Sequence, residues 1–434
     1  MDAVISAGGK GTRLGSLTRE IPKALISVAG RAILAHQLED LAASGISRVW
    51  LLTGHLGEAV ENYVRSNRLP LEVELLREAQ PLGTAGGLAA LAGRIDESFV
   101  FVYGDLIFSV DFGRMAARHA QSGAAITLLA HPNSHPQDSD LIVADNAGRV
   151  LGIRGKAEAR RGYYTNLVNA GAYILSPEVV GSLRPGVKSD FERDVVSRFI
   201  EAGRVFAYRT SEYVKDMGTP ERLKQVEEDL ERGVVVDRRL SRRQRAVFLD
   251  RDGTVNRYVH LLHSPEQLEL LPGAAGAIGR LNASGYLCFV VSNQPVVARN
   301  LCSMADVEET NRKLETLLGA EGAYLDDMRF CPHHPDSGYP GENAAYKIDC
   351  ECRKPKTGMI DELAALYNVD LGRSYMVGDT SVDVQTAANA GMRSILVKSG
   401  MAEEPKKYAA TPGMTAVDLA ETVELILGPA GGLR

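Results

Sequence analysis

The strongest constraint on the fold is a pattern that occurs twice: a short apolar run that ends in a loop of small or acidic residues. Ala3–Ser6 (AVIS) is followed by glycines, and Ala246–Leu249 (AVFL) is followed by DRDGT. An apolar run of this length predicts a strand buried on both faces, as in a parallel sheet. Helical stretches follow each run, and strands that alternate with helices predict a doubly wound α/β domain. The sequence therefore predicts two such domains.

The same alternation continues through both halves of the chain. Strands are predicted at 49–53, 99–103, 125–130, 287–291 and 375–377, and helices at 33–42, 221–233, 273–284 and 304–318. With 434 residues the chain has room for two large α/β domains with mostly parallel sheets. We expect the first over residues 1–232 and the second over 246–434. The arginine-rich stretch 233–245 between them predicts a solvated linker rather than a contact to RNA or phosphate.

Composition excludes several classes of protein. Apolar residues make up 45% of the chain and charged residues 24%, which excludes a disordered chain, a collagen and a small disulfide scaffold. The net charge of −6 argues against a nucleic-acid-binding protein. No apolar run is long enough to cross a bilayer, and the first residues lack the pattern of a signal peptide. With only five cysteines, the sequence predicts a cytoplasmic protein without membrane or nucleic-acid partners.

Glycines and cations follow the first predicted strand. Gly8, Gly9 and Gly11 would let backbone N–H groups approach phosphate oxygens, although glycines also occur at such turns for steric reasons. Arg13 and Lys23 add positive charge that suits a phosphate-rich ligand. The loop lacks both the GK[ST] ending of a Walker A motif and the G-x-G-x-x-G dinucleotide fingerprint. It therefore predicts neither of those two phosphate-binding loops.

Further motifs follow this loop in order: PLGTAGG at 81–87, YGD ending at Asp105, NAGAYIL at 169–175, DFERDV around Glu192 and DMGTP around Asp216. Together with AGGKGTRLG they resemble the signature of sugar-1-phosphate nucleotidyltransferases over about residues 1–230, in particular the heptose and mannose 1-phosphate transferases. In such a reaction the sugar phosphate is already an anion, so positioning and charge neutralisation replace a general base.

This resemblance implies a role for each motif. Arg13 and Lys23 would neutralise the phosphates, and Asp105 and Asp216 would hold Mg²⁺. The nucleotide would lie against Gly8, Gly9, Gly11, Thr12, Gly83 and Thr84, and the sugar against Asn169, Gly171 and Glu192. The chain departs from the family before NAGAYIL, where RGKAEARRG replaces a Glu–Lys pair and leaves Lys156 as the available cation.

Two carboxylates, Asp250 and Asp252, follow the predicted strand that begins at Ala246. At this spacing one can act as a nucleophile and the other as an acid/base. Supporting motifs come in order: Ser292-Asn293-Gln294, Arg353-Lys354-Pro355, and Gly378-Asp379 with Asp383. This set resembles the haloacid-dehalogenase phosphatase superfamily over about residues 246–400. The interval from Asp250 to Ser292 is too short for a cap domain, so we expect an open site that admits a bulky polar substrate.

By this resemblance, Asp250 attacks the phosphoryl group and forms an aspartyl-phosphate. Asp252 protonates the leaving alkoxide and then activates the hydrolytic water. A second Mg²⁺ would be held by Asp250, the backbone carbonyl of Asp252 and Asp379, and would offset the repulsion between carboxylate and phosphate.

The remaining motifs would complete this phosphatase site. Ser292 and Asn293 would bind phosphoryl oxygens, and Lys354 would stabilise the developing charge. Two interpretations of Asp383 stay open, because a carboxylate there can support the site or can be a solvated group at a helix start.

A group of cysteines and histidines precedes the lysine motif. Cys331, Cys350 and Cys352 with one histidine form a Cys₃His set, which predicts a closed, structural Zn²⁺ site. On spacing alone His334 competes with His333, whereas the resemblance favours His333. This loop resembles that of heptose 1,7-bisphosphate phosphatases, with histidinol phosphatases as the rival family. Arg299 and Arg353 are candidates for a distal phosphate, although PVVAR at 295–299 replaces the Ser-Gly-Ile of those relatives.

The presence of both halves in one chain narrows the range of substrates that each half can be expected to use. Removing the 7-phosphate from a heptose 1,7-bisphosphate leaves heptose 1-phosphate, which a sugar-1-phosphate transferase consumes. We therefore expect a bifunctional enzyme that makes a nucleotide-activated heptose from an NTP and a phosphorylated heptose, with GTP favoured by the resemblance and ATP or CTP open. The alternatives are a phosphatase with a non-catalytic, sugar-phosphate-sensing domain, and a mannose 1-phosphate guanylyltransferase fused to a phosphatase. A homo-oligomer is compatible with the sequence.

Overall fold

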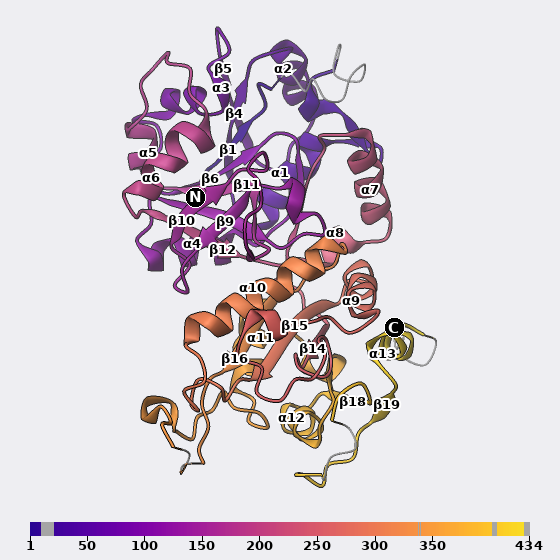
Figure 1. Ribbon diagram of the computed structural model, residues 1–434. Coiled ribbons are helices and arrows are strands. Elements are labelled where there is room, and N and C mark those ends of the chain that lie inside the picture. Colours follow the sequence, from indigo (N-terminus) through magenta and orange to yellow (C-terminus); the bar gives the residue numbers. More distant parts are fainter. Residues whose placement is uncertain (10–20, 337, 339, 402–405, 429–434) are drawn as a thin grey trace. The chain divides into compact units, whose positions relative to one another are not determined.

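The computed structural model describes residues 1–9, 21–336, 338, 340–401 and 406–428 (Figure 1). The chain divides into two compact units. The first unit contains Met1–His131, Asp140–Arg154 and Val168–Ser241, and the second contains Pro132–Ser139, Gly155–Leu167 and Arg242–Arg434. Within the part of the chain that is described, no helix has the length and apolar character needed to span a membrane.

The first unit is built on a mixed sheet with helices beside it. Its strands are β1 (Ala3–Ser6), β2 (Ser27–Val28), β3 (Arg31–Ala32), β4 (Arg48–Thr53), β5 (Glu72–Arg77), β6 (Phe99–Tyr103), β7 (Leu106–Ser109), β8 (Ile126–His131), β9 (Leu141–Ala144), β10 (Val150–Arg154), β11 (Val168–Leu175), β12 (Val205–Arg209) and β13 (Tyr213–Asp216). Its helices are α1 (Ile33–Ala43), α2 (Gly57–Ser66), α3 (Gly83–Gly86), α4 (Phe112–Ser122), α5 (Pro177–Gly181), α6 (Ser197–Glu201), α7 (Pro220–Glu231) and α8 (Val234–Asp237), with short 3₁₀ turns η2 (Lys23–Leu25) and η3 (Gly87–Leu91) and a π-helical turn η5 (Phe191–Val196).

The sheet of the first unit has the strand order β10-β9-β11-β6-β1-β4-β5, with β8 pairing with β11 and β12. The strands β6, β1, β4 and β5 run parallel, and β11 runs antiparallel to β6. Side chains alternate between the two faces of a strand. Ala3 and Ile5 of β1 therefore share a buried cluster with Leu34 and Leu38 of α1. This packing sets the carboxyl ends of β1 and β6 next to each other, where the glycine loop and Asp105 follow them.

The second unit has a fully parallel sheet in the order β16-β15-β14-β17-β18-β19. Its strands are β14 (Ala246–Leu249), β15 (Leu287–Asn293), β16 (Asp327–Cys331), β17 (Tyr375–Gly378), β18 (Arg393–Val397) and β19 (Met414–Ala416). Its helices are α9 (Ala274–Ala283), α10 (Met304–Ala320), α11 (Gly358–Tyr367), α12 (Ser381–Ala390) and α13 (Leu419–Leu427), with 3₁₀ turns η4 (Pro136–Asp138), η6 (Pro265–Gln267), η7 (Ala344–Tyr346) and η8 (Leu371–Arg373).

Both faces of the second sheet are buried, as its unbroken apolar strands predict. Val247 and Leu249 of β14 belong to a cluster that includes residues of α9, α10 and α13. The intervening Phe248 packs against Phe289 of β15, which in turn contacts Tyr367 of α11. Between residues 250 and 292, all of which are described, the chain forms only η6, α9 and the first part of β15. The expectation that no cap domain lies in this interval is thus confirmed.

Two segments that precede β9 and β11 in the chain belong to the second unit. Residues 132–139 and 155–167 pack against α10, where the Tyr164 N–H donates to Thr316 Oγ1 (2.9 Å) and the Asn166 N–H donates to Glu315 Oε2 (3.1 Å). Gly319 of α10 allows this approach, because an added Cβ would lie 2.6 Å from Cγ of Pro136. The predicted domains are continuous stretches of sequence, whereas the second compact unit also includes these two segments.

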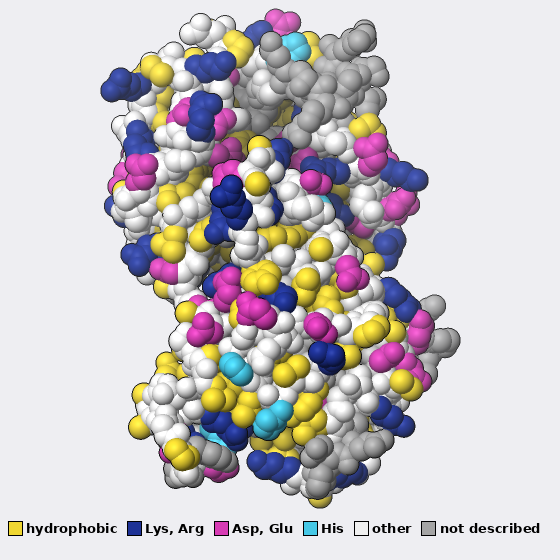
Figure 2. All heavy atoms as spheres, in the orientation of Figure 1, with side chains coloured by type: hydrophobic (Ala, Val, Ile, Leu, Met, Phe, Trp, Pro, Cys, Tyr) yellow, Lys and Arg dark blue, Asp and Glu magenta, His cyan; other side chains and the backbone are white. Residues whose placement is uncertain are grey.

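The stretch 233–245 is not a fully solvated linker, and the expectation that it is one is wrong. Arg239 is 9% exposed and forms an ion pair with Asp40 of α1 (2.5 Å), and it also donates to Ser44 Oγ (2.7 Å). Leu240 is buried, and its N–H donates to Glu212 (2.9 Å). A buried cation is tolerated here because a carboxylate and a hydroxyl meet it. On the face drawn in Figure 2, Lys and Arg side chains are interspersed with Asp and Glu.

Candidate active sites

The acidic residues of the transferase motifs meet at one end of the first sheet. Asp105 follows β6, and Asp216 ends β13, whose pairing with β7 places Asp216 opposite Leu106. The Met217 N–H donates to the Asp105 carbonyl (2.8 Å), which fixes the two loops together. Lys23 forms an ion pair with Asp105. The structure therefore brings together the three predicted residues Lys23, Asp105 and Asp216.

Asp216 is held by a cation that sequence reasoning missed. Arg222, near the start of α7, forms an ion pair with the Asp216 carboxylate, which also accepts from the Gly218 N–H (2.9 Å). Burial alone would raise the pKa of Asp216, but the charges of Arg222 and Lys23 lower it. The carboxylate therefore stays ionised, as a ligand for a hard cation must be.

The PLGTAGG motif forms α3 and is packed too tightly for larger residues. Gly83 has a φ of +81°, and an added Cβ would lie 2.4 Å from the Ser189 carbonyl oxygen. Thr84 Oγ1 accepts from the Phe191 N–H (2.7 Å) and donates to Asp190 (3.3 Å). These contacts join α3 to the start of η5, which carries Glu192.

The predicted sugar-side residues form one hydrogen-bonded network. Glu192 Oε1 accepts from the hydroxyl groups of Tyr103 (2.9 Å) and Tyr173 (2.7 Å). Asn169 donates to the Tyr173 hydroxyl (2.7 Å), and its own Oδ1 accepts from the Gly171 N–H (3.2 Å). Burial raises the pKa of Glu192, while the two tyrosine hydroxyls oppose that rise. Sequence reasoning missed both tyrosines, although each lies within or beside a quoted motif.

The glycine loop is described only in part. Gly8 and Gly9 end the described stretch, and Gly8 lies against Gly54, where a Cβ added to Gly54 would lie 3.3 Å from the Gly8 Cα. The predicted residues Gly11, Thr12 and Arg13 lie outside the described residues.

The phosphatase residues meet at the carboxyl ends of β14 and β17. Lys354 is 4% exposed, and its Nζ lies 2.9 Å from Asp250 Oδ1 and 2.6 Å from Asp383 Oδ1. Asp383 is 2% exposed, so the interpretation of it as a solvated helix-start carboxylate is wrong. Its second oxygen caps α12 by accepting from the Thr380 N–H (3.2 Å) and hydroxyl (2.7 Å). Asp383 thus fixes Lys354 to the start of α12.

Burial and like charges shift the pKa values of these carboxyl groups. Burial raises the pKa of Asp250 to about 7, although the ammonium of Lys354 lowers it. Burial, together with the charge of Asp383, raises the pKa of Asp379 to about 6. The carboxylate oxygens of Asp250, Asp379 and Asp383 approach within 4.8 Å of one another. Such a concentration of buried negative charge fits a site for a divalent cation with oxygen ligands.

Asp252 is held by side-chain donors from three residues. Gln294 donates to Asp252 Oδ2 (2.8 Å), Asn256 donates to Oδ1 (2.9 Å), and the Arg251 guanidinium contacts both oxygens (3.0 and 3.2 Å). Burial alone would raise the pKa of Asp252, but Arg251 and these amide donors lower it. Gln294 also donates to Ser292 Oγ (2.8 Å), so Asp252 and Ser292 share one partner.

Asn293 makes contacts that the sequence did not predict. Its side chain donates to the Lys354 carbonyl (3.1 Å) and accepts from the Lys354 N–H (3.0 Å). Both polar atoms of the amide therefore hold the backbone of Lys354. Arg353 donates to the His333 carbonyl (2.9 Å), which ties the same segment to the cysteine loop.

The four predicted zinc ligands form a cluster. Cys352 Sγ lies 3.2 Å from both Cys331 Sγ and Cys350 Sγ, and His333 Nδ1 lies 3.3 Å from Cys352 Sγ and 3.7 Å from Cys331 Sγ. A tetrahedral Zn²⁺ with three sulfur ligands and one nitrogen ligand has ligand–ligand edges of about 3.5–3.8 Å. His334 instead accepts from the Asp336 N–H (3.2 Å). The cluster is thus compatible with zinc, and the competition between the two histidines is decided for His333.

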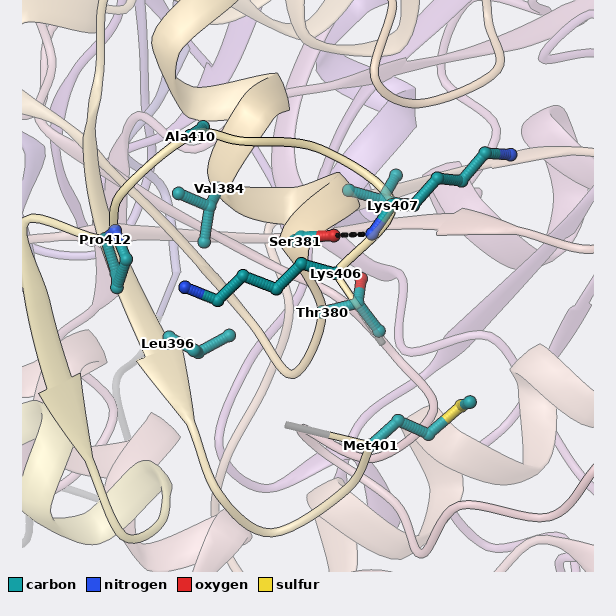
Figure 3. A pocket seen from close by; sticks show the side chains of 10 residues that line it. Thr380, Ser381, Val384, Leu396, Met401, Lys406, Lys407, Ala410 and Pro412 are labelled. Atoms are coloured by element: carbon teal, nitrogen blue, oxygen red, sulfur yellow. Dashed lines mark hydrogen bonds between the residues drawn. The ribbon is translucent and has the colours of Figure 1, made fainter. Parts of the chain in front are cut away.

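A cavity of about 170 Å³ lies beside the phosphatase site, at the start of α12. Its wall is mainly apolar, with Val384, Leu396 and Pro412 among the lining residues. Figure 3 shows the Lys406 side chain running toward Pro412, while the Lys407 side chain points the other way. Thr380 joins this cavity to the site, because it follows Asp379 directly and caps α12. None of the predicted substrate-binding residues that the structure describes lines this cavity.

Comparisons with known proteins agree with this geometry. The nucleotidyl transferase family model matches residues 2–233, and a HAD-hydrolase-like family model matches residues 351–422. Over 188 residues the chain is 42% identical to a D-glycero-D-manno-heptose-1,7-bisphosphate 7-phosphatase of Thermosynechococcus vestitus, covering 42% of this chain and 94% of that protein. Over 238 residues it is 32% identical to a mannose-1-phosphate guanylyltransferase of Mycobacterium tuberculosis, covering 54% of this chain and 66% of that protein. The solved structure of HddC from Yersinia pseudotuberculosis aligns with a TM-score of 0.46 and 26% identity, covering 53% of this chain and 99% of that one.

These matches divide the chain as the two sites do. The nucleotidyl transferase match spans more than half of the chain and contains Lys23, Asp105 and Asp216. The phosphatase relative is matched over nearly its whole length. The chain belongs to the nucleotidyl transferase family, and its second half is a HAD-like phosphatase of the heptose-bisphosphate type. It is an enzyme with both activities.

Proposed function

We propose that the enzyme first removes the 7-phosphate of a heptose 1,7-bisphosphate and then transfers a nucleotidyl group from an NTP to the resulting heptose 1-phosphate, with release of pyrophosphate. GTP is the proposed donor, because the similar transferase from Mycobacterium tuberculosis is a guanylyltransferase. The observation that carries this proposal is the presence of both sites in one chain. The product of the phosphatase reaction is the substrate class of the transferase, and a histidinol phosphatase has no such relation to the first half.

In the phosphatase step, Asp250 attacks phosphorus and its Oδ–P bond forms as the bond to the C7 oxygen breaks. In its protonated form Asp252 gives a proton to the leaving alkoxide. As the carboxylate, the form that Arg251 and the amide donors favour, it then removes a proton from the water that hydrolyses the aspartyl-phosphate. Lys354 lies within 2.9 Å of Asp250 and balances the charge that accumulates there. Asp250, Asp379 and the backbone carbonyl of Asp252 would hold Mg²⁺, which supplies further positive charge.

In the transferase step, the sugar phosphate is the nucleophile and attacks the α-phosphorus of the NTP, so pyrophosphate leaves without a general base. Lys23 supplies positive charge, and the predicted partner of that role, Arg13, lies outside the described residues. Asp105 and Asp216 would hold Mg²⁺. The sugar hydroxyls would meet the network of Asn169, Tyr173 and Glu192, which offers both donors and acceptors.

The cysteine cluster is proposed to hold a structural Zn²⁺ through Cys331, His333, Cys350 and Cys352. All four positions are protein ligands, which leaves no open coordination position for catalysis. Arg299 and Arg353 lie on the loops beside the cluster and are the proposed cations for the phosphate at C1 during the first step. The contact of Arg353 with the His333 carbonyl supports this, because zinc binding would then fix the arginine as well.

The test is to offer heptose 1,7-bisphosphate with each of the four NTPs separately and to identify the product by mass. We expect one equivalent each of phosphate and pyrophosphate and a nucleotide-heptose, formed best with GTP. If phosphate is released but no NTP yields pyrophosphate, the first half is a non-catalytic domain that senses sugar phosphates. If mannose 1-phosphate is consumed in preference to heptose 1-phosphate, the protein is a mannose 1-phosphate guanylyltransferase fused to a phosphatase.

A further inference from the structure

Arg251, which stands between the two catalytic aspartates, is buried although nothing in the proposed reaction needs a third charge there. It is 1% exposed and is among the largest fully buried side chains of the described residues. A buried guanidinium costs several kcal/mol unless its donors are paired. The direction of those donors therefore indicates what Arg251 does.

The guanidinium spans the distance from the acid/base to helix α10. Its Nη2 lies 3.0 Å from Asp252 Oδ2 and 3.2 Å from Oδ1, and its Nε lies 3.3 Å from Oδ1. On the other side, Nη1 donates to Oδ1 of Asn311 (3.0 Å). Asn311 is 8% exposed and lies in the middle of α10, a helix of 17 residues whose apolar face packs on the sheet. A planar guanidinium held at both ends is a rigid connection.

We propose that Arg251 and Asn311 together form a brace that holds the Asp252 carboxyl in line with the oxygen of the leaving group. The buried Arg251 separates Asn311 from the reacting atoms of the substrate. Asn311 is therefore a positioning residue for the proton transfer. The inference rests on the proposed phosphatase mechanism. Asn256 and Gln294 hold the same carboxyl but come from its own loop and the next strand, whereas the brace fixes it to a helix. General acid catalysis depends on such placement, because the proton must lie in hydrogen-bond reach of the leaving oxygen.

The brace predicts a dependence on the leaving group. When phosphoryl is transferred to Asp250 from a sugar phosphate, the departing alkoxide takes a proton from Asp252. When the substrate is p-nitrophenyl phosphate, p-nitrophenolate leaves as a stable anion and needs no proton. In both cases the aspartyl-phosphate is then hydrolysed with Asp252 as base. A misplaced Asp252 therefore slows the first step only for the sugar phosphate, and slows the second step for both substrates.

The experiment compares Asn311→Leu, Asn311→Asp and wild type in the full chain. For Asn311→Leu we expect kcat/KM for heptose 1,7-bisphosphate to fall by about 30- to 100-fold, which is part of the roughly 100-fold or larger contribution that a general acid makes, since Asp252 itself remains. We expect kcat/KM for p-nitrophenyl phosphate to fall by less than about threefold. Because hydrolysis of the intermediate becomes slow, p-nitrophenolate should appear in a burst of about one equivalent per site. Asn311→Asp keeps an oxygen acceptor for Arg251 and should restore most of the loss.

The matched control is Thr310→Val, since Thr310 is buried in the same turn and its hydroxyl donates to the carbonyl of Asp306 (2.8 Å) rather than to Arg251. It should leave the ratio of the two kcat/KM values unchanged. Equal losses on both substrates in Asn311→Leu, or no loss on either, would overturn the brace. If Asn311→Leu does not fold, Arg251→Lys is measured instead. The ratio of the two kcat/KM values is then expected to change as predicted for Asn311→Leu. A failure of the proposed function gives a different result: wild type then hydrolyses p-nitrophenyl phosphate but not heptose 1,7-bisphosphate. In that case the brace is tested by comparing p-nitrophenyl phosphate with a simple alkyl phosphate.

Discussion

The two active sites differ in how far their charges are enclosed by protein. In the phosphatase site Lys354, Asp379 and Asp383 are each less than 5% exposed, and Lys354 contacts two carboxylates. In the transferase site the side chains of Asp216 and Arg222 are 35% and 37% exposed. The first set of charges is fixed by its own members. In the second set the side chains of Lys23 and Asp105 are 12% and 24% exposed, so the described part of the transferase site is partly exposed and less enclosed than the phosphatase site.

This difference follows from the two reactions. In the proposed mechanism the phosphatase forms a covalent bond to its own Asp250, so the nucleophile, the lysine and the acid/base must be in place before the substrate arrives. The transferase joins two substrates that are both negatively charged. The positive charges of its site are therefore balanced by phosphate groups only when both substrates are bound. We therefore expect single substitutions to be most severe in the enclosed phosphatase site.

The largest effect is expected for Asp250→Asn. Loss of the nucleophile should reduce phosphate release from heptose 1,7-bisphosphate by about 10⁴-fold or more. Transfer from heptose 1-phosphate, measured as pyrophosphate release, should stay near normal, because Asp250 is not among the residues proposed for the transferase reaction. Asp105→Ala is the matched reverse variant and should remove only pyrophosphate release. A folded variant of either kind that loses both activities would contradict the independence of the two sites.

The next effect concerns the cysteine cluster. Cys350→Ser should lower bound zinc well below one equivalent and lower the unfolding temperature of the second unit by about 10 °C, because structural zinc contributes directly to folding. Metal analysis and calorimetry measure this. Cys302→Ser is the control, since Cys302 lies outside the cluster. The zinc assignment would be wrong if wild-type protein that was never exposed to a chelator holds less than about half an equivalent of zinc.

A third prediction sets the order of the two reactions. A 7-phosphate entering the sugar side of the transferase would approach Glu192, whose carboxyl is already buried with two tyrosine hydroxyls. An unpaired dianion there costs several kcal/mol, so the bisphosphate should be a poorer transferase substrate than heptose 1-phosphate by about a hundredfold. The Asp250→Asn variant tests this, because it cannot remove the 7-phosphate. Rapid formation of a nucleotide-heptose 7-phosphate would reverse the proposed order.

The smallest effect is on stability. Burial raises the pKa of Glu212, which is 3% exposed, to about 7. The folded state therefore holds this proton more tightly than the unfolded state, and the free energy of unfolding falls as the pH rises from about 4.5 to about 7. Glu212→Gln should remove this loss and raise stability at pH 8 by about 1–2 kcal/mol, while making little difference at pH 4.5.

Denaturant titrations at the two pH values measure that change. The matched control is Glu97→Gln, because Glu97 is an exposed acid of the same unit. The Glu97→Gln change should leave the free energy of unfolding unchanged at both pH values. A Glu212→Gln variant that is less stable than wild type at pH 8 would show that the charged form of Glu212 stabilises the fold through its bonds to Asp111 and Leu240.

Local sequence predicted the elements that carry the sites. The strands at β1 and β14, the helices α1, α7, α9 and α10, and the parallel arrangement follow from apolar runs and helical spacing, which local residues decide. The family resemblance also predicted that Asp250 and Lys354 belong to one site, and that His333 rather than His334 joins the three cysteines; these residues do lie together. These residues follow the carboxyl ends of parallel strands, and such ends share one edge of a sheet.

Only the tertiary structure decided how those residues are held. Arg251 meets Asn311, which is 60 residues away in the chain, and Asn293 bonds the backbone of Lys354, which is 61 residues away. The burial of Arg239 against Asp40 likewise depends on a contact between distant segments. Each of these contacts depends on which face of a helix packs against which strand, and on the rotamer that close packing leaves available. Local sequence determines where a strand ends and which side chains follow it, whereas packing over long distances determines what surrounds them.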